Sequence, residues 1–427
     1  MTPMSAPCTC PHETPAPTGM SRRTLLRGAA AVAGLAALES TTLSTRLAFG
    51  ATAYTGDVLV VLSLRGGFDG LSCVVPHGDP AYYANRPGIG VPKAALLAPD
   101  AMFGLHPAMA PLLPFWQAGT FGAVHAVGQA SPTRSHFSAM EEMERAAPGS
   151  SARTGWLDRT LGLSAATSAF QGTYVGSGGS PSAFAGPVAE MAMRSVDSFS
   201  LSGVDAKNRA RWETALKAMH DGAPPVLAAP AATTLAATAT TGALAAQGYA
   251  PANGAAYPSG GLGSALKEVA RLVKAGVGLQ AAAVDYGDWD MHAGLGRADS
   301  GWMRDKLTEL SRALAAFATD LGPAMSGVTL VTLSEFGRRV KENASGGVDH
   351  GHGNAVLMLG GGVVGGRVHG TWPTLAAGAL VGGDLRGTTD YRAILGEVLQ
   401  KRCGAGSLST VFPGLAATTS GVVRARS

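Results

Sequence analysis

Four continuous apolar runs constrain the fold of this chain more than any other feature. All four are rich in aliphatic residues, and each is followed by a cluster of polar residues and glycine. The runs are Val58–Leu64, Phe121–Val127, Leu279–Val284 and Val328–Leu333. Apolar runs of this length are typical of parallel strands that are buried on both faces. They therefore predict a sheet in the interior of a domain.

Segments with helical periodicity separate these runs. A fifth strand is expected at Ala355–Leu359, and helices are expected from about Phe137, over about 205–220 and 262–275, and over Gly301–Leu321 and Tyr391–Lys401. The alternation of strands and helices predicts a single α/β domain, with a mostly parallel sheet sandwiched between helices. A segment at 224–261, rich in Ala, Thr, Pro and Gly, is expected to be a mostly irregular, low-complexity surface insertion.

The composition excludes two broad classes of protein. Hydrophobic residues make up 46% of the chain and charged residues 15%, which is enough to form a large core and excludes a disordered protein. The formal net charge is only +4, and no basic run lies outside the N-terminal region. Nucleic-acid binding is therefore not expected.

The N-terminal region predicts export. Arg22 and Arg23 precede the weakly apolar run Gly28–Leu38, which is about half the ~20 residues that a membrane-spanning helix needs. This pattern resembles a twin-arginine signal, and the small residues around Ala48–Ala51 offer a cleavage site. We expect a signal peptide over 1–50, a mature domain over 51–427, contact with the twin-arginine translocase, and a periplasmic or secreted location. Membrane contact is expected only through the signal peptide; the alternatives are an uncleaved anchor or a chance arginine pair.

The cysteines add little to this picture. Cys8 and Cys10 would leave with a cleaved signal peptide, and Cys73 and Cys403 would remain. In an oxidising periplasm these two could form a disulfide. Buried free thiols fit the sequence equally well.

Two of the polar clusters combine carboxylates with imidazoles. Asp288 and His292 are four residues apart in the loop after the third run and could share one cation, with Asp290 as an alternative ligand. His350 and His352 are flanked by glycines before the fifth predicted strand. A mixed carboxylate and imidazole set suits zinc, manganese or iron. The open end of an α/β sheet is where such sites are found, although solvated polar turns are the plain alternative.

Two further carboxylates follow predicted strands. Asp69 lies in a glycine-rich bend after the first run, and Glu335 follows the fourth run. Both are candidate metal ligands. A helix cap or turn closure for Asp69, and a helix N-terminal carboxylate for Glu335, are the structural alternatives.

The loop Ser131–His136 carries the candidate catalytic groups. It supplies hydroxyls, a guanidinium and an imidazole ahead of a predicted helix N-terminus. A hydroxyl nucleophile, an arginine clamp and helix amides are what a phosphate or sulfate ester hydrolase needs. The candidates are Ser135, Arg134 and His136, and Ser135 could instead be only the cap of the helix.

Six motifs together carry a family resemblance. They are Leu64–Leu71, Arg134–Phe137, Thr154–Leu157, Trp289–His292, Ser334–Arg338 and Asp349–Gly353. From Leu59 to about Leu399 the chain resembles an exported bacterial family known as domain of unknown function 1501. That family is similar to distant members of the alkaline phosphatase and sulfatase superfamily. The resemblance implies an alkaline-phosphatase-like fold.

The resemblance also implies roles for the metal-ligand candidates. In the superfamily pattern, Asp69 matches the first aspartate, and Asp288 and His292 match a spaced pair. Glu335 falls at the aspartate of an Asp-His pair, and His350 or His352 matches the final histidine. These residues would bind one or two divalent cations, zinc or manganese rather than calcium.

The chain departs from the superfamily pattern at two positions. Ala130 replaces the cysteine that sulfatases modify to formylglycine, so Ser131 or Ser135 would have to serve as nucleophile. Phe336 replaces the histidine of the Asp-His pair, and His136 is a candidate to supply the missing imidazole.

Two functions follow from the resemblance. The first is an exported, metal-dependent hydrolase of phosphate or sulfate esters, acting on a small-molecule or glycan ester. The alternative is a catalytically inactive, sulfatase-like exported protein that binds a cell-surface glycan or a partner protein.

Overall fold

The computed structural model describes residues 54–165, 168–205, 207–416 and 419–426. The predicted signal peptide, its cleavage site, and Cys8 and Cys10 lie outside these ranges. Among the helices within them, none combines the length and apolarity that crossing a membrane requires.

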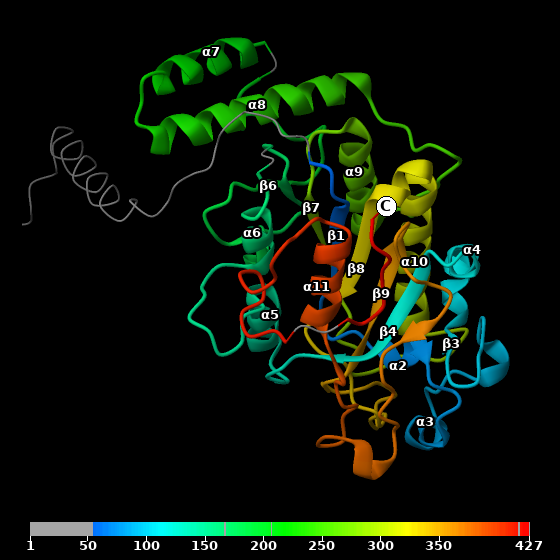
Figure 1. The fold of residues 1–427 in the computed structure, drawn as a ribbon. Helices are drawn as coiled ribbons and strands as arrows, with labels where there is room; N and C mark the ends of the chain where they lie inside the picture. The colour runs from blue at the N-terminus through cyan, green and yellow to red at the C-terminus, as the bar shows by residue number, and fades with distance from the viewer. Residues whose placement is uncertain (1–53, 166–167, 206, 417–418, 427) are drawn as a thin grey trace, which may run out of the picture. The chain divides into compact units, whose positions relative to one another are not determined.

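The domain is built on a mixed, mostly parallel sheet (Figure 1). Its strands lie in the order β10-β4-β9-β8-β1-β7-β5-β6, and β11 also pairs with β4. The strands are β1 (Val58–Leu64), β4 (Phe121–Gly128), β5 (Gly172–Val175), β6 (Met191–Met193), β7 (Ala281–Tyr286), β8 (Val328–Leu333), β9 (Asn354–Gly360), β10 (Val368–His369) and β11 (Thr389–Asp390). Strand β1 pairs in parallel with both β7 and β8, whereas β9 runs antiparallel to β8 and β4. Strands β2 (Val74–Val75) and β3 (Gly104–Leu105) form a separate small sheet.

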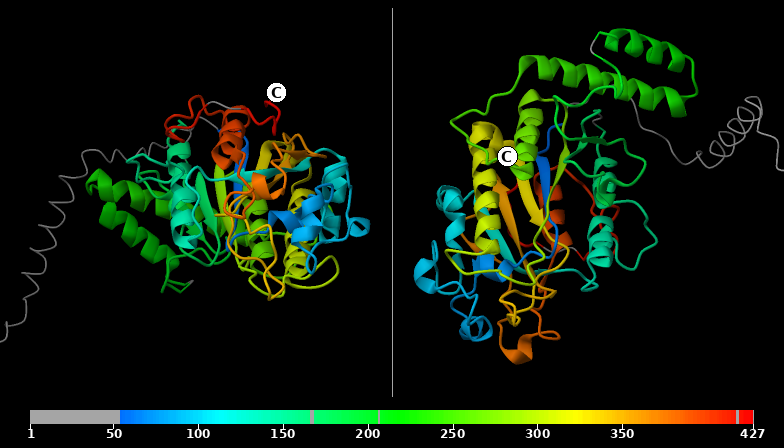
Figure 2. Two further views of the ribbon diagram at one scale, coloured as in Figure 1. Left: turned by 90° about the horizontal axis from the view of Figure 1, so that it is seen from below. Right: turned by 180° about the vertical axis from the view of Figure 1, so that it is seen from behind.

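Helices cover both faces of the sheet, as Figure 2 shows. Helices α9 (Gly261–Ala275) and α10 (Trp302–Leu321) pack on one face, and α5 (His136–Arg145), α6 (Trp156–Leu161) and α11 (Tyr391–Lys401) pack on the other. Alternate residues of β1 enter the two cores, because side chains point to opposite faces along a strand. The predicted α/β class, with its sheet between helices, is confirmed.

The low-complexity insertion is helical where we expected irregular structure. Helix α8 (Pro225–Gln247) occupies most of it and follows α7 (Arg209–His220). Alanine is the strongest helix former, and it dominates this segment. Thr233 and Thr238 bond their hydroxyls to carbonyls one turn earlier, so these polar groups are satisfied within the helix. The expectation of irregular structure was therefore wrong for 225–247.

The remaining helices are short, and the two cysteines are not paired. The short helices are α2 (Gly70–Cys73), α3 (Pro80–Asn85) and α4 (Leu113–Gln117). Cys73 is a buried free thiol and Cys403 a partly buried one, so the disulfide alternative does not hold.

Strands β8 and β9 separate near the edge of the sheet that carries the polar loops. Their ladder runs as far as Val331 and Met358. The next amide, that of Leu357, donates to the hydroxyl of Thr332 at 2.8 Å. A side chain thus replaces a backbone partner where the strands diverge, which keeps a buried N–H satisfied.

We predict that Thr332→Val lowers the free energy of unfolding by about 1–3 kcal/mol. Valine has the shape of threonine but leaves the buried Leu357 amide without an acceptor. Urea unfolding measures the change. Thr214→Val, on exposed α7, is the control and should stay within about 0.5 kcal/mol of the parent protein. Equal losses of stability in the two variants would show that the Thr332 hydroxyl has no special role as an acceptor.

Candidate metal centre

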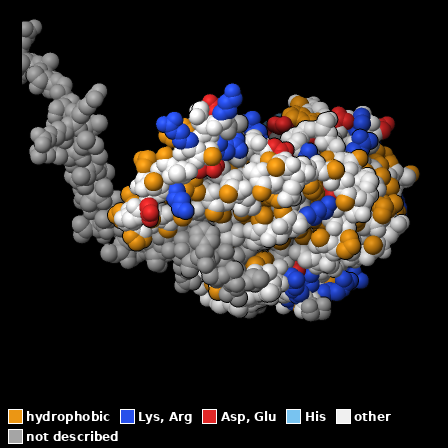
Figure 3. Space-filling view, turned by 90° about the horizontal axis from the view of Figure 1, so that it is seen from above, with side chains coloured by type: hydrophobic (Ala, Val, Ile, Leu, Met, Phe, Trp, Pro, Cys, Tyr) orange, Lys and Arg blue, Asp and Glu red, His pale blue; other side chains and the backbone are white. Residues whose placement is uncertain are grey.

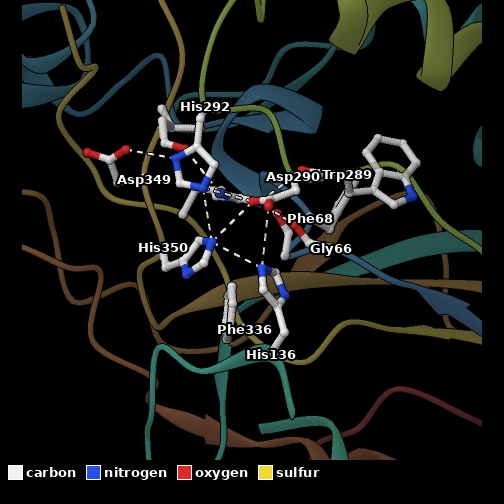
Figure 4. A network of polar contacts seen from close by, with 12 residues as sticks. Gly66, Phe68, His136, Trp289, Asp290, His292, Phe336, Asp349 and His350 are labelled. Atoms are coloured by element: carbon white, nitrogen blue, oxygen red, sulfur yellow. Dashed lines mark hydrogen bonds and ion pairs between the residues drawn. The ribbon is translucent and has the colours of Figure 1, made fainter. Parts of the chain in front are cut away.

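Three imidazoles and one carboxylate converge at one edge of the sheet (Figure 4). His136 is the first residue of α5, after β4, and Asp290 and His292 lie in the loop after β7. His350 precedes β9. Because β9 runs antiparallel, its beginning lies at the edge where the neighbouring strands end. The strand order thus brings together three loops that are far apart in sequence.

Ligand atoms of His136, Asp290 and His350 all lie within 4.8 Å of one another, and His292 is in contact with the last two of these side chains. Nε2 of His350 lies 3.0 Å from Nε2 of His136 and 3.0 Å from Nε2 of His292. One carboxylate oxygen of Asp290 is 2.9 Å from Nε2 of His292 and 3.1 Å from that of His350, and the other is 3.6 Å from that of His136. A tetrahedral zinc ion with bonds of 2.0–2.2 Å separates its ligands by about 3.4 Å. The five separations given above, which do not include the one between His136 and His292, bracket that value.

Each imidazole is oriented by an acceptor on its other nitrogen. Nδ1 of His136 donates to Glu335 at 2.8 Å, and Nδ1 of His292 donates to Asp349 at 2.8 Å. Nδ1 of His350 donates to the backbone carbonyl of Arg134 at 2.8 Å. With the proton on Nδ1, each ring directs the lone pair of Nε2 into the cluster. This pattern of carboxylate or carbonyl partners is the one that accompanies metal-binding histidines.

The guanidinium of Arg338 fixes the carboxylate of Asp290. Arg338 is buried, and it donates to Asp290 at 2.6 Å and to the carbonyls of Gly67, Trp289 and Val348 at 2.5–3.1 Å. Partial burial raises the pKa of Asp290. The hydrogen bond and charge of Arg338, followed by His350 and His292, outweigh it and lower that pKa to about 2. Asp290 is therefore an anion at neutral pH.

Glu335 lies directly behind the cluster. It is buried, and besides His136 it accepts from the backbone N–H of Gly66 at 2.8 Å. Its backbone carbonyl accepts from Gln129, whose amide also donates to Ala139 on α5. The end of β8 thus positions both the ring of His136 and the helix that carries it.

Phe336 forms an apolar floor under two of the rings. Its ring centroid is 4.8 Å from that of His136 and 4.9 Å from that of His350. The exposed fractions of the ligand side chains run from 23% for His350 to 46% for Asp290. The cluster is therefore accessible from solvent on one side.

The metal-ligand candidates divide into three groups. His292 and His350 lie in the cluster, and Glu335 contacts it through His136. The sequence left Asp290 as an alternative ligand to Asp288, and it is the carboxylate of Asp290 that lies in the cluster. Asp288 adopts a left-handed backbone conformation with φ of 63°, and its charge acts on Lys306.

Asp69 and His352 are engaged elsewhere. The buried carboxylate of Asp69 forms a bidentate ion pair with Arg86 at 2.5 and 2.9 Å. Nε2 of His352 faces the carbonyl of Gln129 at 3.4 Å, and burial lowers the pKa of this imidazole. As placed, neither side chain serves the cluster as a ligand, which corrects both expectations.

The three catalytic candidates have different surroundings. The guanidinium of Arg134 binds Asp384 at 2.5 and 3.1 Å, and only its backbone carbonyl reaches the cluster. His136 is a member of the cluster. Ser135 is exposed at the start of α5 and makes no side-chain capping bond, so the capping alternative does not account for its hydroxyl.

Sequence reasoning missed two contributors to the site. Asp349 entered the sequence analysis only as the start of the Asp349–Gly353 motif and was given no role, although a carboxylate beside a candidate ligand is a signal for a histidine partner. The role of Arg338 could not be predicted, because the sequence does not distinguish a buried arginine in a loop from an exposed one.

The fold and the cluster define a mixed α/β domain with a candidate metal centre at one edge of its sheet. Residues 57–383 match the family described as "Protein of unknown function (DUF1501)", and the chain belongs to this family. No curated protein matches the chain. Among solved structures, the PsFucS1 sulfatase from Pseudoalteromonas sp. is similar with a TM-score of 0.36 and 12% sequence identity, over 92% of this chain and 77% of that one.

We predict that Asp69→Asn lowers the free energy of unfolding by roughly 3–5 kcal/mol at neutral pH, because it leaves the charge of Arg86 buried and unpaired. Burial raises the pKa of Asp69, but Arg86 outweighs it and the pKa is lowered. The contribution of this ion pair to the free energy of unfolding is therefore complete above the ordinary carboxyl pKa of about 4. It is lost as the pH falls through the lowered pKa of Asp69.

Chemical denaturation at neutral and acid pH measures both effects. The difference in free energy of unfolding between the parent protein and Asp69→Asn should become smaller at acid pH. Exposed Asp221→Asn is the control, with an expected change within about 0.5 kcal/mol. A difference that widens in acid would contradict the pairing.

Proposed function

We propose that this protein is an exported, metal-dependent hydrolase of phosphate or sulfate esters. The observation that carries the proposal is the position of Nε2 of His350, which lies 3.0 Å from Nε2 of both His136 and His292 and 3.1 Å from the carboxylate of Asp290. Neutral imidazoles in this tautomer repel one another unless a cation lies between them. Zinc and manganese accept such a nitrogen and oxygen set, and zinc is the first choice because three of the four side chains are imidazoles.

The surroundings of the cluster suit an anionic substrate. Helix α5 begins at His136 without a capping side chain, so the positive end of its dipole is directed to this region. The loop that precedes it carries the exposed hydroxyl groups of Ser131 and Ser135. An ester oxygen bound here would meet N–H donors and a hydroxyl at the same time.

The residues of the chain would then have distinct tasks. His136, Asp290, His292 and His350 would hold the metal, and Glu335 and Asp349 would hold two of the rings in place. A bound divalent cation supplies Lewis acidity and makes a water or hydroxyl more acidic. Ser135 is our candidate to attack or to orient the water, because its side chain is exposed beside His136.

Export belongs to the same proposal. We infer that Arg22 and Arg23 direct the folded chain to the twin-arginine translocase and that the mature domain acts in the periplasm or outside the cell. Export in the folded state would allow the metal to be acquired before the protein crosses the membrane.

We predict that the purified full chain carries close to one equivalent of zinc or manganese. Asp290→Asn and His350→Ala should each reduce that content at least about tenfold, since each removes a ligand. Asp288→Asn and His352→Ala change nearby residues outside the cluster and should retain the metal. Elemental analysis of the folded proteins decides the matter. An empty parent protein, or equal losses in the control variants, would contradict the site.

Metal-loaded protein should hydrolyse 4-nitrophenyl phosphate or 4-nitrophenyl sulfate, and chelation should abolish the activity. Asp290→Asn is expected to be inactive and Asp288→Asn active. Bound metal without hydrolysis of either ester would favour the catalytically inactive binding protein. The ion pair of Arg134 with Asp384 is the observation that favours this second candidate, because it occupies the expected anion clamp.

We predict that Arg22→Lys/Arg23→Lys retains the protein in the cytoplasm, because the translocase reads the arginine pair. Immunoblots of periplasmic and cytoplasmic fractions measure this. Arg27→Lys keeps the pair and is the control. Unchanged export of the double variant would contradict a twin-arginine signal.

A further inference from the structure

The hairpin of α7 and α8 is the part of the described chain with the most unusual surface. Helix α8 has 23 residues and not one charged side chain. Its C-terminal half is attached to the body of the domain: Ala237 and Thr241 are buried, and the carbonyl of Leu244 accepts from Arg271 at 2.6 Å. The other half and α7 extend beyond the sheet at the end opposite to α2 and α3 (Figures 1 and 2).

Large apolar side chains are concentrated on the free half of this hairpin. Half of the exposed large hydrophobic residues of the described chain lie here: Trp212, Met219, Val226 and Leu227, with exposed fractions of 51–71%. Met219, Val226 and Leu227 flank the turn between the helices. Helix α7 has no buried residue at all. Figure 3 looks onto this end of the molecule and shows hydrophobic side chains spread among charged groups of both signs.

Cationic side chains border the apolar stripe of α7. At 100° per residue, Trp212 and Met219 lie within about 20° of one another around the helix. Arg209 lies about 60° to one side of Trp212, with the carboxylate of Glu213 beyond it at about 100°, and Arg211 lies about 100° to the other side. An apolar stripe between two arginines is the pattern of helices at a lipid surface, where the guanidinium groups reach phosphate while the stripe enters the acyl region.

The charge of this surface favours an anionic bilayer over a second copy of the chain as its occupant. Helix α7 carries Arg209, Arg211 and Lys217 and one carboxylate, that of Glu213. A second copy would bring the same excess of positive charge to the contact, whereas anionic lipid headgroups complement it. The exposed tryptophan suits the same interface.

We propose that the free half of the α7–α8 hairpin docks on an anionic lipid surface, with Trp212, Met219, Val226 and Leu227 entering the interface. This adds a second membrane contact to the signal peptide, which the sequence had suggested as the single one. It is independent of the proposed hydrolase activity. The hairpin would hold the domain at the membrane without spanning it.

Vesicle flotation of the full chain tests the proposal. Vesicles of phosphatidylglycerol with phosphatidylcholine should carry the protein, and Val226→Ser/Leu227→Ser should weaken that binding at least about tenfold. Arg209→Glu/Arg211→Glu should weaken it too, and added salt should reproduce that effect. Because all variants keep residues 1–53, any binding by the apolar run Gly28–Leu38 is common to them.

Leu163→Ser/Val381→Ser is the matched control, since both residues are exposed aliphatics outside the hairpin. It should bind vesicles like the parent protein, and thermal melting should show every variant folded. Vesicle binding that the hairpin substitutions leave unchanged would overturn the proposal. So would a dimer in size-exclusion chromatography that Val226→Ser/Leu227→Ser dissolves without any vesicle binding, because the occupant would then be a second copy.

Discussion

The arrangement of the candidate metal centre depends on the buried guanidinium of Arg338. This side chain has no exposed surface, and it binds carbonyls of the loops after β1, after β7 and before β9 as well as the carboxylate of Asp290. A buried arginine is stable only when its donors are satisfied, so these loops are held together by one charge. The carboxylate of Asp290, which belongs to the cluster, is thus also the counter-ion of the Arg338 guanidinium that holds the loops together.

The topology of the sheet explains why the cluster forms at this edge. The carboxyl ends of the parallel strands lie at a common edge of the sheet. Because β9 runs antiparallel, the loop that precedes it lies at the same edge. His350 is therefore brought to His136 and His292, although their loops are far apart in the chain. Hydrogen bonds from the three Nδ1 atoms then fix the rings so that the Nε2 lone pairs point into the cluster. Fixed lone pairs lower the cost of ordering when a cation binds.

The sequence predicted the buried strands better than the surface helices. It also predicted which loops carry the site, but not how the side chains of those loops are arranged. Strands β1 and β8 match the apolar runs because burial on both faces leaves a continuous pattern. Helix α8 was missed because its composition suggests an irregular segment, whereas its alanines favour a helix. The four-residue spacing of Asp288 and His292 predicted that these two side chains bind one cation. The left-handed turn at Asp288 instead presents Asp290, and no sequence pattern could reveal the pairing of Asp69 with Arg86.

Anomalous diffraction from crystals grown with zinc would locate the bound metal. We expect one ordered peak, bonded to Nε2 of His136, His292 and His350 and to the carboxylate of Asp290 at about 2.0–2.2 Å. Its height should fall to background in Asp290→Asn crystals. An absent peak in the parent protein, or one bonded to Asp288 or His352, would contradict the metal centre and with it the proposed chemistry.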